Sequence, residues 1–427
     1  MENRQLSGAC LIGQSGGPSS VINASVYGII QAARADEHIT RILAAHHGVK
    51  GILDDDIFDL DKEDEEQIEL LPTTPASALG TCRVKLKKFE DDDSDYIKVL
   101  EVFKKYDVRY FFLIGGNDSM DTCSKLNDYM QQVGYDCVIM GVAKTIDNDL
   151  YGTDHTPGYG SAAKYVASTF MEVYQDANVY DTPMVVIVEV MGRNAGWLTA
   201  ASTLASSVGG LGPDLVYLPE VPFDMDTFMN DVKRVYQQKN HVLVAISEGV
   251  KDENGIYISE YGDLGNPDKR MDAFGHTQMG GLALKLVGVI KTYLNVKTRD
   301  IELSLLQRCS EGYASNTDIE EAKYLGSEAV RYAREGENGK MVGFRRVSDD
   351  PYEIVSELLP LDRVANFEQK IPLEWIKKDR TGLTEEFARY ALPLIQGEPP
   401  VKKVNGLPKF AHLKMIKAEA EKQERTL

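Results

Sequence analysis

The chain has 427 residues, of which 43% are hydrophobic and 26% charged, and its formal net charge is −19. This length exceeds one ordinary core, so we expect a soluble globular protein of at least two domains. The negative charge argues against nucleic acid or an anionic membrane surface as a partner. No apolar run approaches the roughly 18 residues of a membrane span, and the N-terminus lacks a secretory leader pattern, so we expect a cytoplasmic protein with no membrane partner.

Short apolar runs typical of β-strands alternate with segments of helical periodicity. They predict strands over residues 8–13, 39–46, 108–116, 137–142, 184–192, 241–249 and 300–308, with helices over 94–106 and 225–239 among the segments between them. Strand, helix and strand in series predict an α/β fold with mainly parallel sheets covered on both faces. Such sheets bind ligands at the carboxyl ends of their strands, so functional residues are expected there.

Two other stretches have a distinctive composition. The acidic run over residues 59–71 lacks ordered ligand spacing, so we interpret it as a solvated face or loop and not as a metal site. From about residue 351 the strand pattern is lost, and "HLKMIKAEAEKQERTL" (412–427) predicts a helix on the surface or at a subunit contact. Five cysteines, odd in number and widely spaced, indicate reduced core residues.

Two glycine-rich turns follow predicted strands. "GQSGGPSSVINAS" (13–25) places Gly16 and Gly17 before a helix start, and "IGGNDSM" (114–120) repeats the arrangement of strand, two glycines and helix. Glycines let an anion approach the backbone, and a helix N-terminus favours negative charge. A purely structural turn is the alternative for either one alone. Two such turns at strand ends favour a phosphate site.

A third strand end carries a dense polar cluster. "VAKTIDND" (142–149) places Lys144, Thr145, Asp147, Asn148 and Asp149 within six residues. Carboxylates beside a lysine suit a general base and a cation that neutralises phosphate, the two roles that phosphoryl transfer needs besides a metal. The neighbouring "GYGSAA" (158–163) matches a dinucleotide fingerprint, but no strand directly precedes it, so a nicotinamide site has little support.

Further polar residues follow the later strands. The segment "EVMGRNAGW" (189–197) ends a strand at Met191, Gly192 and Arg193, and "VAISEG" (244–249) ends one at Glu248. The segment "KTRDIELSLLQRC" (297–309) adds two more arginines. A lone arginine is usually a surface residue, whereas arginines at several strand ends favour bidentate binding of a phosphate.

Taken in order, these segments resemble a known family. "GQSGGP", "LGTCR", "GGNDSM", "KTIDND", "MGRNAGW", "SEG", "FGHTQMGG" and "LLQR" resemble the phosphofructokinases, most closely the pyrophosphate-dependent branch, over about residues 8–347. The resemblance implies two Rossmann-like, three-layer α/β domains with the active site in the cleft between them. Residues 1–160 and about 309–350 would bind the phosphoryl donor, residues 161–308 would bind fructose 6-phosphate, and residues 351–427 would form a helical C-terminal extension.

The resemblance also implies an activity and roles for individual residues. The reaction would move a phosphoryl group reversibly from diphosphate to the C1 hydroxyl of fructose 6-phosphate, in glycolysis and gluconeogenesis. Asp147 would be the base, and the other catalytic residues would be Asp118, Lys144, Thr145 and Arg193. Fructose 6-phosphate would be bound by Thr145, Asp147, Asp149, Met191, Gly192, Arg193, Glu248, Arg299, Leu305 and Arg308, with Arg299 on its 6-phosphate. Diphosphate would be contacted by Gly16, Gly17, Arg83 and Lys144.

A metal and an assembly are implied as well. Mg²⁺ would be the cofactor, and Asn117 stands where many relatives have an aspartate associated with the ion. Because Mg²⁺ prefers carboxylate oxygens, we expect it to be held mostly by diphosphate, water and another acid. The family suggests a homodimer or homotetramer. Leu305 stands where this branch often has a tyrosine.

Two positions identify the expected donor. ATP-using relatives have glycine at both, whereas this chain has Asp118 and Lys144. Asp118 would occupy the space of the ATP α-phosphate and repel it by roughly 1 kcal/mol in water-like surroundings, or about 4 kcal/mol at an effective dielectric of 20. Lys144 would neutralise the departing phosphate. We therefore expect diphosphate as donor; the alternatives are an ATP-dependent enzyme with an adapted pocket and a catalytically silent sugar-phosphate sensor.

Overall fold

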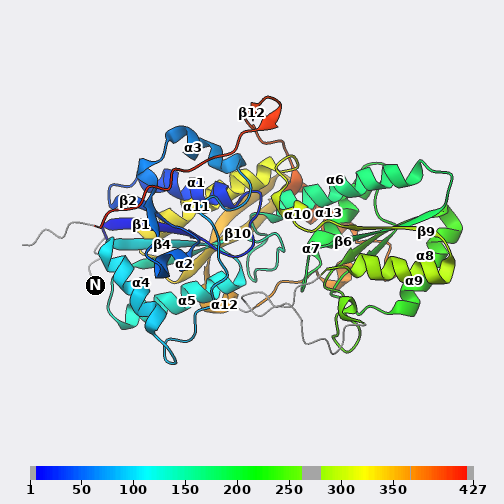
Figure 1. Cartoon of the computed structure of the whole chain (residues 1–427), viewed down its shortest axis with the longest axis horizontal. Helices are drawn as coiled ribbons and strands as arrows, with labels where there is room; N and C mark the ends of the chain where they lie inside the picture. The colour runs from blue at the N-terminus through cyan, green and yellow to red at the C-terminus, as the bar shows by residue number, and fades with distance from the viewer. Residues whose placement is uncertain (1–5, 262–279, 366, 421–427) are drawn as a thin grey trace, which may run out of the picture.

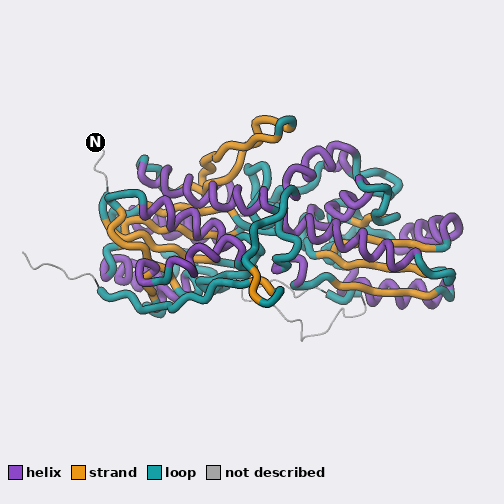
Figure 2. Tube along the Cα trace, turned by 90° about the horizontal axis from the view of Figure 1, so that it is seen from above, coloured by secondary structure: helices purple, strands orange, loops and turns teal. Residues whose placement is uncertain are grey.

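The computed structural model describes residues 6–261, 280–365 and 367–420. The chain forms two lobes that lie side by side along its long axis (Figure 1). Each lobe is an open sheet with helices on both faces, which gives three layers (Figure 2). The predicted α/β class is confirmed. No helix in the described ranges is long and apolar enough to cross a membrane.

The larger sheet has seven strands in the order β11-β10-β5-β4-β1-β2-β3. Its central strands run parallel, and β3 and β11 pair antiparallel at the two edges. The strands are β1 (Gly8–Gln14), β2 (Ile39–Ala45), β3 (Ile57–Asp59), β4 (Val108–Gly115), β5 (Val138–Ala143), β10 (Lys340–Asp349) and β11 (Tyr352–Pro360). Strands β1 and β5 are buried along their whole length, because helices cover both faces of a parallel sheet.

Helices cover the larger sheet on both sides (Figure 1). On one side lie α1 (Ile22–Arg34) and α11 (Asn316–Arg334), with α3 (Glu65–Leu70); on the other lie α2 (Val49–Leu53), α4 (Ser94–Lys105), α5 (Asn117–Gln132) and α12 (Leu361–Val364). Helices α1 and α11 cross at a pair of glycines: a Cβ on Gly28 would lie 2.0 Å from the Lys323 carbonyl oxygen, and one on Gly326 would lie 2.2 Å from that of Ser25. This crossing therefore requires glycine at both positions.

The smaller sheet has four parallel strands in the order β7-β8-β6-β9. They are β6 (Met184–Val190), β7 (Leu215–Tyr217), β8 (His241–Ser247) and β9 (Lys297–Glu302). One face packs on α6 (Tyr159–Asn178) and α7 (Trp197–Ala201), and the other on α8 (Met225–Lys239) and α9 (Leu282–Leu294). The short helix α10 (Leu306–Cys309) follows β9, so the strand predicted over 300–308 is confirmed only over 300–302 and is wrong over 303–308.

Residues after 350 differ from the prediction. The strand pattern continues, since β11 pairs along its whole length with β10. Beyond it lie α12, α13 (Glu385–Ala391) and a hairpin of β12 (Lys403–Val404) and β13 (Leu407–Pro408). The helix predicted over 412–427 is absent from residues 412–420, which run along the larger lobe and bridge to Phe58 at Lys417. Residues 421–427 lie outside the described part.

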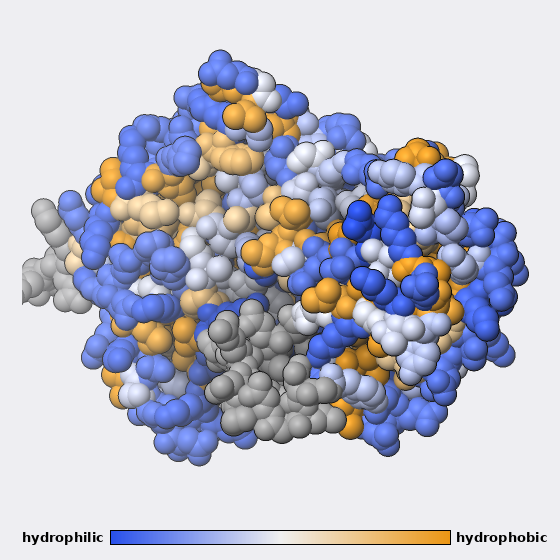
Figure 3. Space-filling model, turned by 45° about the vertical axis from the view of Figure 1, so that its right-hand side comes forward, coloured by the Kyte–Doolittle hydropathy of each residue, from blue (hydrophilic) through white to orange (hydrophobic). Residues whose placement is uncertain are grey.

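The acidic run over 59–71 explains why residues 412–420 lie along the larger lobe. Most of its acidic side chains are exposed, as predicted for a solvated face, but the run is not a loop: it ends β3 and continues into α3, and the side chains of Asp59 and Glu63 are buried. The Glu63 carboxylate accepts hydrogen bonds from the backbone N–H groups of Lys414 and Met415, at 2.7 and 2.8 Å. The carboxylate therefore fixes the C-terminal segment on the larger lobe. Elsewhere hydrophilic side chains cover most of the face in Figure 3, as the high charge predicts.

Candidate active site

A cavity of about 470 Å³ opens where strands of both sheets end. Parallel sheets place such sites at the carboxyl ends of their strands, where the loops diverge. The cavity is lined by Gly16, Gly17, Pro18, Arg83, Lys85, Gly116, Asn117, Asp118, Ser119, Lys144, Thr145, Ile146, Asp147, Asp149, Met191, Arg193, Asn194, Ala195, Glu248, Arg308 and Glu368. The structure therefore brings together all the predicted site residues except Gly192, Arg299 and Leu305.

The first glycine turn lies between β1 and α1. Gly16 has a φ of 78°, a backbone conformation that favours glycine, and a Cβ there would lie 3.5 Å from the Lys144 Nζ. A Cβ on Gly17 would lie 3.1 Å from the Arg308 Nη1. The Lys144 Nζ itself donates to the Gly17 carbonyl oxygen at 2.6 Å. The bare backbone of this turn therefore faces two cations, which suits a bound anion.

The second glycine turn leads from β4 into α5 and carries a carboxylate. Gly116 is the N-cap residue of α5, and Asp118 lies in the first turn of that helix and lines the cavity. A negative side chain in the first turn is stabilised by the partial positive charge of the helix N-terminus. The chain's own carboxylate thus occupies the position at which such a turn otherwise favours a phosphate.

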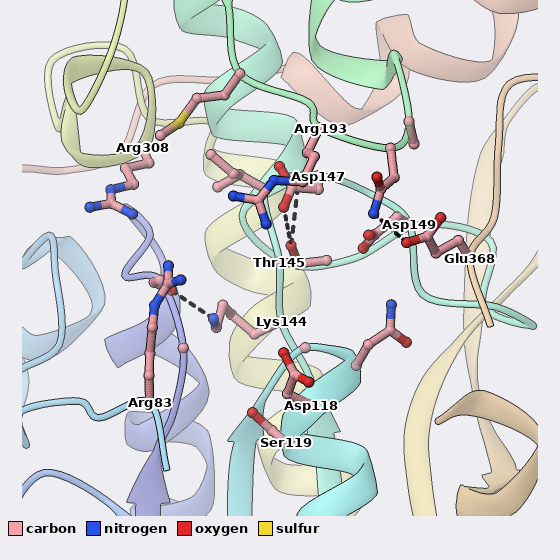
Figure 4. Close-up of a pocket in the computed structure, with 18 of the residues that line it drawn as sticks. Arg83, Asp118, Ser119, Lys144, Thr145, Asp147, Asp149, Arg193, Arg308 and Glu368 are labelled. Carbon is pink, nitrogen blue, oxygen red and sulfur yellow. Dashed lines mark hydrogen bonds between the residues drawn. The ribbon is translucent and has the colours of Figure 1, made fainter. Parts of the chain in front are cut away.

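The third strand end carries Asp147, the predicted base, and the cation Lys144 (Figure 4). Lys144 is 3% exposed, and burial lowers its pKa to about 8, against the opposing effect of Asp147. The Asp147 backbone N–H donates to the Thr145 Oγ1 at 3.1 Å, and that hydroxyl lies 3.4 Å from the Asp147 Oδ2. Burial raises the pKa of Asp147, and the nearby Lys144 opposes this effect. A carboxylate with a raised pKa, next to a buried cation, is suited to accept a proton and to return it.

The loops of the smaller lobe are held by side chains that accept from the backbone. The Met191 N–H donates to the Gln307 Oε1 at 3.2 Å, and the Gly192 N–H donates to the Glu248 Oε1 at 3.3 Å. Gly192 has a φ of 138°, and a Cβ there would lie 2.6 Å from the Ala195 carbonyl oxygen, so it shapes this turn without lining the cavity. Burial raises the pKa of Glu248 to about 7.

Besides Gly192, two predicted residues lie outside the cavity of this chain. Arg299 is exposed on the edge strand β9, and the Leu305 side chain is 54% exposed just before α10. Their contacts with the sugar phosphate stay predictions. Burial and the neighbouring Arg83 lower the pKa of Arg308, which does line the cavity.

Sequence reasoning missed several lining residues. Lys85 lies two residues after Arg83 in an extended segment, so the alternation of side chains along such a segment could have indicated it. Glu368 comes from the region beyond β11, and no local pattern pointed to it. Its Oε1 accepts from the Asn194 Nδ2 at 2.5 Å, which joins this region to the loop after β6.

Asn117 is not oriented as a simple metal ligand. With its amide placed to satisfy its neighbours, the side-chain nitrogen donates to the carbonyl oxygens of Val364 and Phe367, both at 3.2 Å. Within the described residues, no group of three or more acidic, histidine or cysteine side chains could hold a metal ion. A metal at this site would therefore depend on oxygens of the substrate as well as on the protein.

Comparison with known proteins agrees with this geometry. Residues 9–302 match the family model described as phosphofructokinase. The pyrophosphate–fructose 6-phosphate 1-phosphotransferase of Halomonas elongata is 42% identical over 416 residues, covering 96% of this chain and 97% of that relative. That of Xanthomonas campestris is 41% identical over 412 residues, with the same coverage.

A solved structure is similar over the whole chain. The pyrophosphate-dependent phosphofructokinase from Nitrosospira multiformis superposes with a TM-score of 0.86 at 36% identity and covers 97% of both chains. The match to the family model spans more than half of the sequence, and the relatives cover nearly all of it. This chain therefore belongs to the phosphofructokinase family.

Proposed function

We propose that this chain transfers a phosphoryl group from diphosphate to the C1 hydroxyl of fructose 6-phosphate, giving fructose 1,6-bisphosphate and phosphate. The observation that carries the proposal is the pair Asp118 and Lys144, whose side chains both line the cavity beside the glycine turns. Asp118 fills and charges the position that a longer nucleotide phosphate chain would need, and Lys144 supplies a buried positive charge. The names of the relatives from Halomonas elongata and Xanthomonas campestris support the same donor.

The residues divide the reaction between them. Gly16, Gly17, Arg83 and Lys144 would hold the diphosphate, with the larger lobe (residues 1–160 and about 309–350) as the donor-binding domain. Asp147 would accept the proton of the C1 hydroxyl as its oxygen forms a bond to the terminal phosphorus, and the bond from that phosphorus to the bridging oxygen breaks. The leaving phosphate would carry the electron pair beside Lys144. In reverse, Asp147 would return the proton to the C1 oxygen.

The acceptor would be held from the smaller lobe (residues 161–308). Met191, Arg193, Glu248 and Arg308 line the cavity on this side, and arginine binds phosphate with two parallel hydrogen bonds. We also propose a homodimer or homotetramer in the cytoplasm, in which Arg299, exposed on an edge strand, would reach the 6-phosphate in the cavity of a second copy.

Magnesium fits this site as a partner of the diphosphate. Mg²⁺ keeps several waters and is usually bound by one or two carboxylates together with phosphate oxygens. Asp118 and Asp147 are lining carboxylates that could hold it with the diphosphate. When bound, the ion would neutralise charge on the transferring phosphoryl group.

A donor comparison tests the proposal. Purified protein is given fructose 6-phosphate and Mg²⁺ with either diphosphate or ATP, and fructose 1,6-bisphosphate is measured. We expect rapid formation with diphosphate and a kcat/KM for ATP lower by at least about 10²-fold, from the steric clash together with about 1–4 kcal/mol of repulsion. Turnover with ATP alone would identify an ATP-dependent enzyme, and no turnover with either donor would identify a sugar-phosphate sensor.

A further inference from the structure

The loop after β5 that carries Asp147, Asn148 and Asp149 is hydrogen-bonded to residues that follow β11. Asn148 lies between the base Asp147 and the second carboxylate Asp149, and it has a φ of 55°. Its side chain is 1% exposed and points away from solvent into the protein. The Asn148 Oδ1 accepts from the Thr156 backbone N–H at 3.0 Å, and the Nδ2 donates to the Tyr390 Oη at 2.7 Å. Both ends of this amide are therefore used.

Tyr390 lies on α13, in the region between the two lobes (Figure 1). Its hydroxyl accepts from Asn148 and donates to the Asp154 carbonyl oxygen at 2.8 Å. Its ring packs against Trp197 and Trp375, with ring centroids 5.2 and 5.8 Å away. The ring is thus fixed by packing, and the hydroxyl is placed to join both ends of the loop that contains the base.

A second contact joins the same two parts of the chain. The Gln369 backbone N–H donates to the Asp149 carbonyl oxygen at 2.8 Å, and Leu150 and Glu368 form an antiparallel bridge. The loop that presents Asp147 and Asp149 therefore has a backbone partner on one side and the Tyr390 hydroxyl on the other. Both partners come from residues beyond β11, and both act on the two residues that follow Asp147.

Catalysis depends on small displacements of such a loop. A non-glycine residue with a positive φ persists only where its surroundings fix it. A reacting group that is displaced by about 1 Å can lose 10²-fold in rate, even when the displaced atoms only support the chemistry. Without the Tyr390 hydroxyl, the Asn148 amide would be left with an unsatisfied buried donor, and the loop would gain alternative positions.

We propose that Tyr390 is a positioning residue for the base: its hydroxyl, through Asn148, holds the loop so that Asp147 faces the substrates. The inference rests on the proposed function, because it assigns Asp147 its role. The residues after β11 are then a part of the catalytic machinery and not only a cover for the lobes. Tyr390 does not line the cavity, so its effect reaches the reaction only through the loop.

The test removes one oxygen atom. In the Tyr390→Phe variant we expect kcat to fall by about tenfold, with the KM of each substrate within about twofold, because binding groups stay in place while the base is mispositioned. The matched control is Tyr135→Phe. The Tyr135 hydroxyl also makes two hydrogen bonds, to the carbonyl oxygens of Phe103 and Val108, but it lies near the opposite, amino end of β4. We expect wild-type kcat in this control and melting temperatures within about 2 °C of each other for the two variants.

A double-mutant cycle tests the route through Asn148. Asn148→Gly removes the amide and keeps a residue that adopts a positive φ freely. If Tyr390 acts through this amide, Tyr390→Phe lowers kcat in the wild-type background and has no further effect in the Asn148→Gly background. Equal kcat for the wild type and Tyr390→Phe, or effects that multiply in the double variant, would overturn the inference.

The choice of phosphoryl donor in the assay separates the test of the proposed function from the test of Tyr390. All variants are assayed with the donor that the wild-type chain uses, whether diphosphate or ATP. A wild type that works only with ATP contradicts the proposed function and leaves the test of Tyr390 intact. A wild type that works with diphosphate, together with an unchanged Tyr390→Phe variant, contradicts this inference alone.

Discussion

The cavity has two ends of opposite charge, and they are built differently. At the basic end, Arg83, Lys144 and Arg308 gather beside the first glycine turn, while Asp149 and Glu368 lie at the acidic end (Figure 4). The basic end combines backbone from a bare turn with cations from separate elements. The acidic end joins the catalytic loop to a residue beyond β11. Phosphate oxygens are favoured at the first end, and a proton is held at the second.

Burial shifts the pKa of a charged side chain at each end, Lys144 at the basic end and Asp149 at the acidic end. Lys144 is almost fully buried, and burial lowers its pKa to about 8, whereas the Arg83 side chain is exposed. At the other end burial, Asp147 and Glu368 raise the pKa of Asp149 to about 8. Asp147 lies between the ends and is influenced by both. The comparison predicts that changes near Asp147 and Lys144 affect turnover most, and that changes toward the rim affect it least.

The largest effect is expected at the junction of the two ends. Asp147→Asn keeps the shape of the side chain and removes the proposed base, so kcat should fall by about 10³-fold while the KM for fructose 6-phosphate changes by no more than about threefold. The measurement is steady-state formation of fructose 1,6-bisphosphate, with sugar-phosphate binding measured separately by calorimetry. A kcat within tenfold of wild type would exclude Asp147 as the base.

The next largest effect is expected at the basic end, where a buried lysine, Lys144, is compared with an exposed one, Lys85. Lys144→Met removes a buried charge beside the proposed position of the leaving phosphate, and kcat should fall by about 10²-fold, the typical cost of losing one preorganised group of this kind. Lys85→Met removes a cation that also lines the cavity but is exposed, so kcat/KM should change by only a few fold. Equal losses in the two variants would show that burial does not distinguish these cations.

A change at Asp118 tests which phosphoryl donor the chain prefers, and not how fast it turns over. Asp118→Gly removes volume and charge at the N-terminus of α5, and the ratio of kcat/KM for ATP to that for diphosphate should rise by at least about tenfold. The matched control is Asp121→Gly on the same helix, where the aspartate pairs with Lys125 outside the cavity. This control carries the same glycine and the same loss of charge. A donor ratio unchanged in Asp118→Gly would remove the proposed basis of donor selection.

These contrasts also show what could be predicted from the sequence. The basic end depends on chemistry that is local in the chain: Gly16 and Gly17 lie together, and Lys144 lies three residues before Asp147. Their motifs were therefore recognised, and the structure brings them to one cavity. Glu368 and Tyr390 contact the same loop from positions far along the chain. No spacing rule connects residues so distant, so both were missed.

In the fold as well, elements determined by local sequence were predicted, and elements determined by distant contacts were not. Buried parallel strands are continuous apolar runs, and β1, β2, β4, β5, β6 and β8 were predicted with small errors at their ends. Strand β9 was predicted three residues too late and too long, and β3, β7 and β10 were not predicted. Strand β11 lies at an edge and is half-exposed, so it lacks such a run. The residues over 412–420 have a composition that favours helix, but their backbone pairs instead with Glu63 and Phe58, and tertiary contacts overrode the local preference.

The smallest effect is expected at the rim of the acidic end, and it concerns pH. In the wild type kcat/KM should fall above pH about 8, because Lys144 loses its proton and Asp149 becomes negative, each with a pKa of about 8. The negative charge of Glu368 helps to raise the pKa of Asp149, since a nearby like charge disfavours ionisation. In Glu368→Gln, Asp149 should therefore ionise at lower pH.

The expected displacement of this alkaline limb is about half a pH unit toward lower pH, because Glu368 is exposed and its field is screened. The measurement is kcat/KM from pH 6 to about 10, and Glu374→Gln serves as control, since Glu374 is an exposed carboxylate of the same region that does not line the cavity. A displacement toward higher pH would contradict the coupling between Glu368 and Asp149, because removing a negative neighbour can only make the second carboxyl a stronger acid.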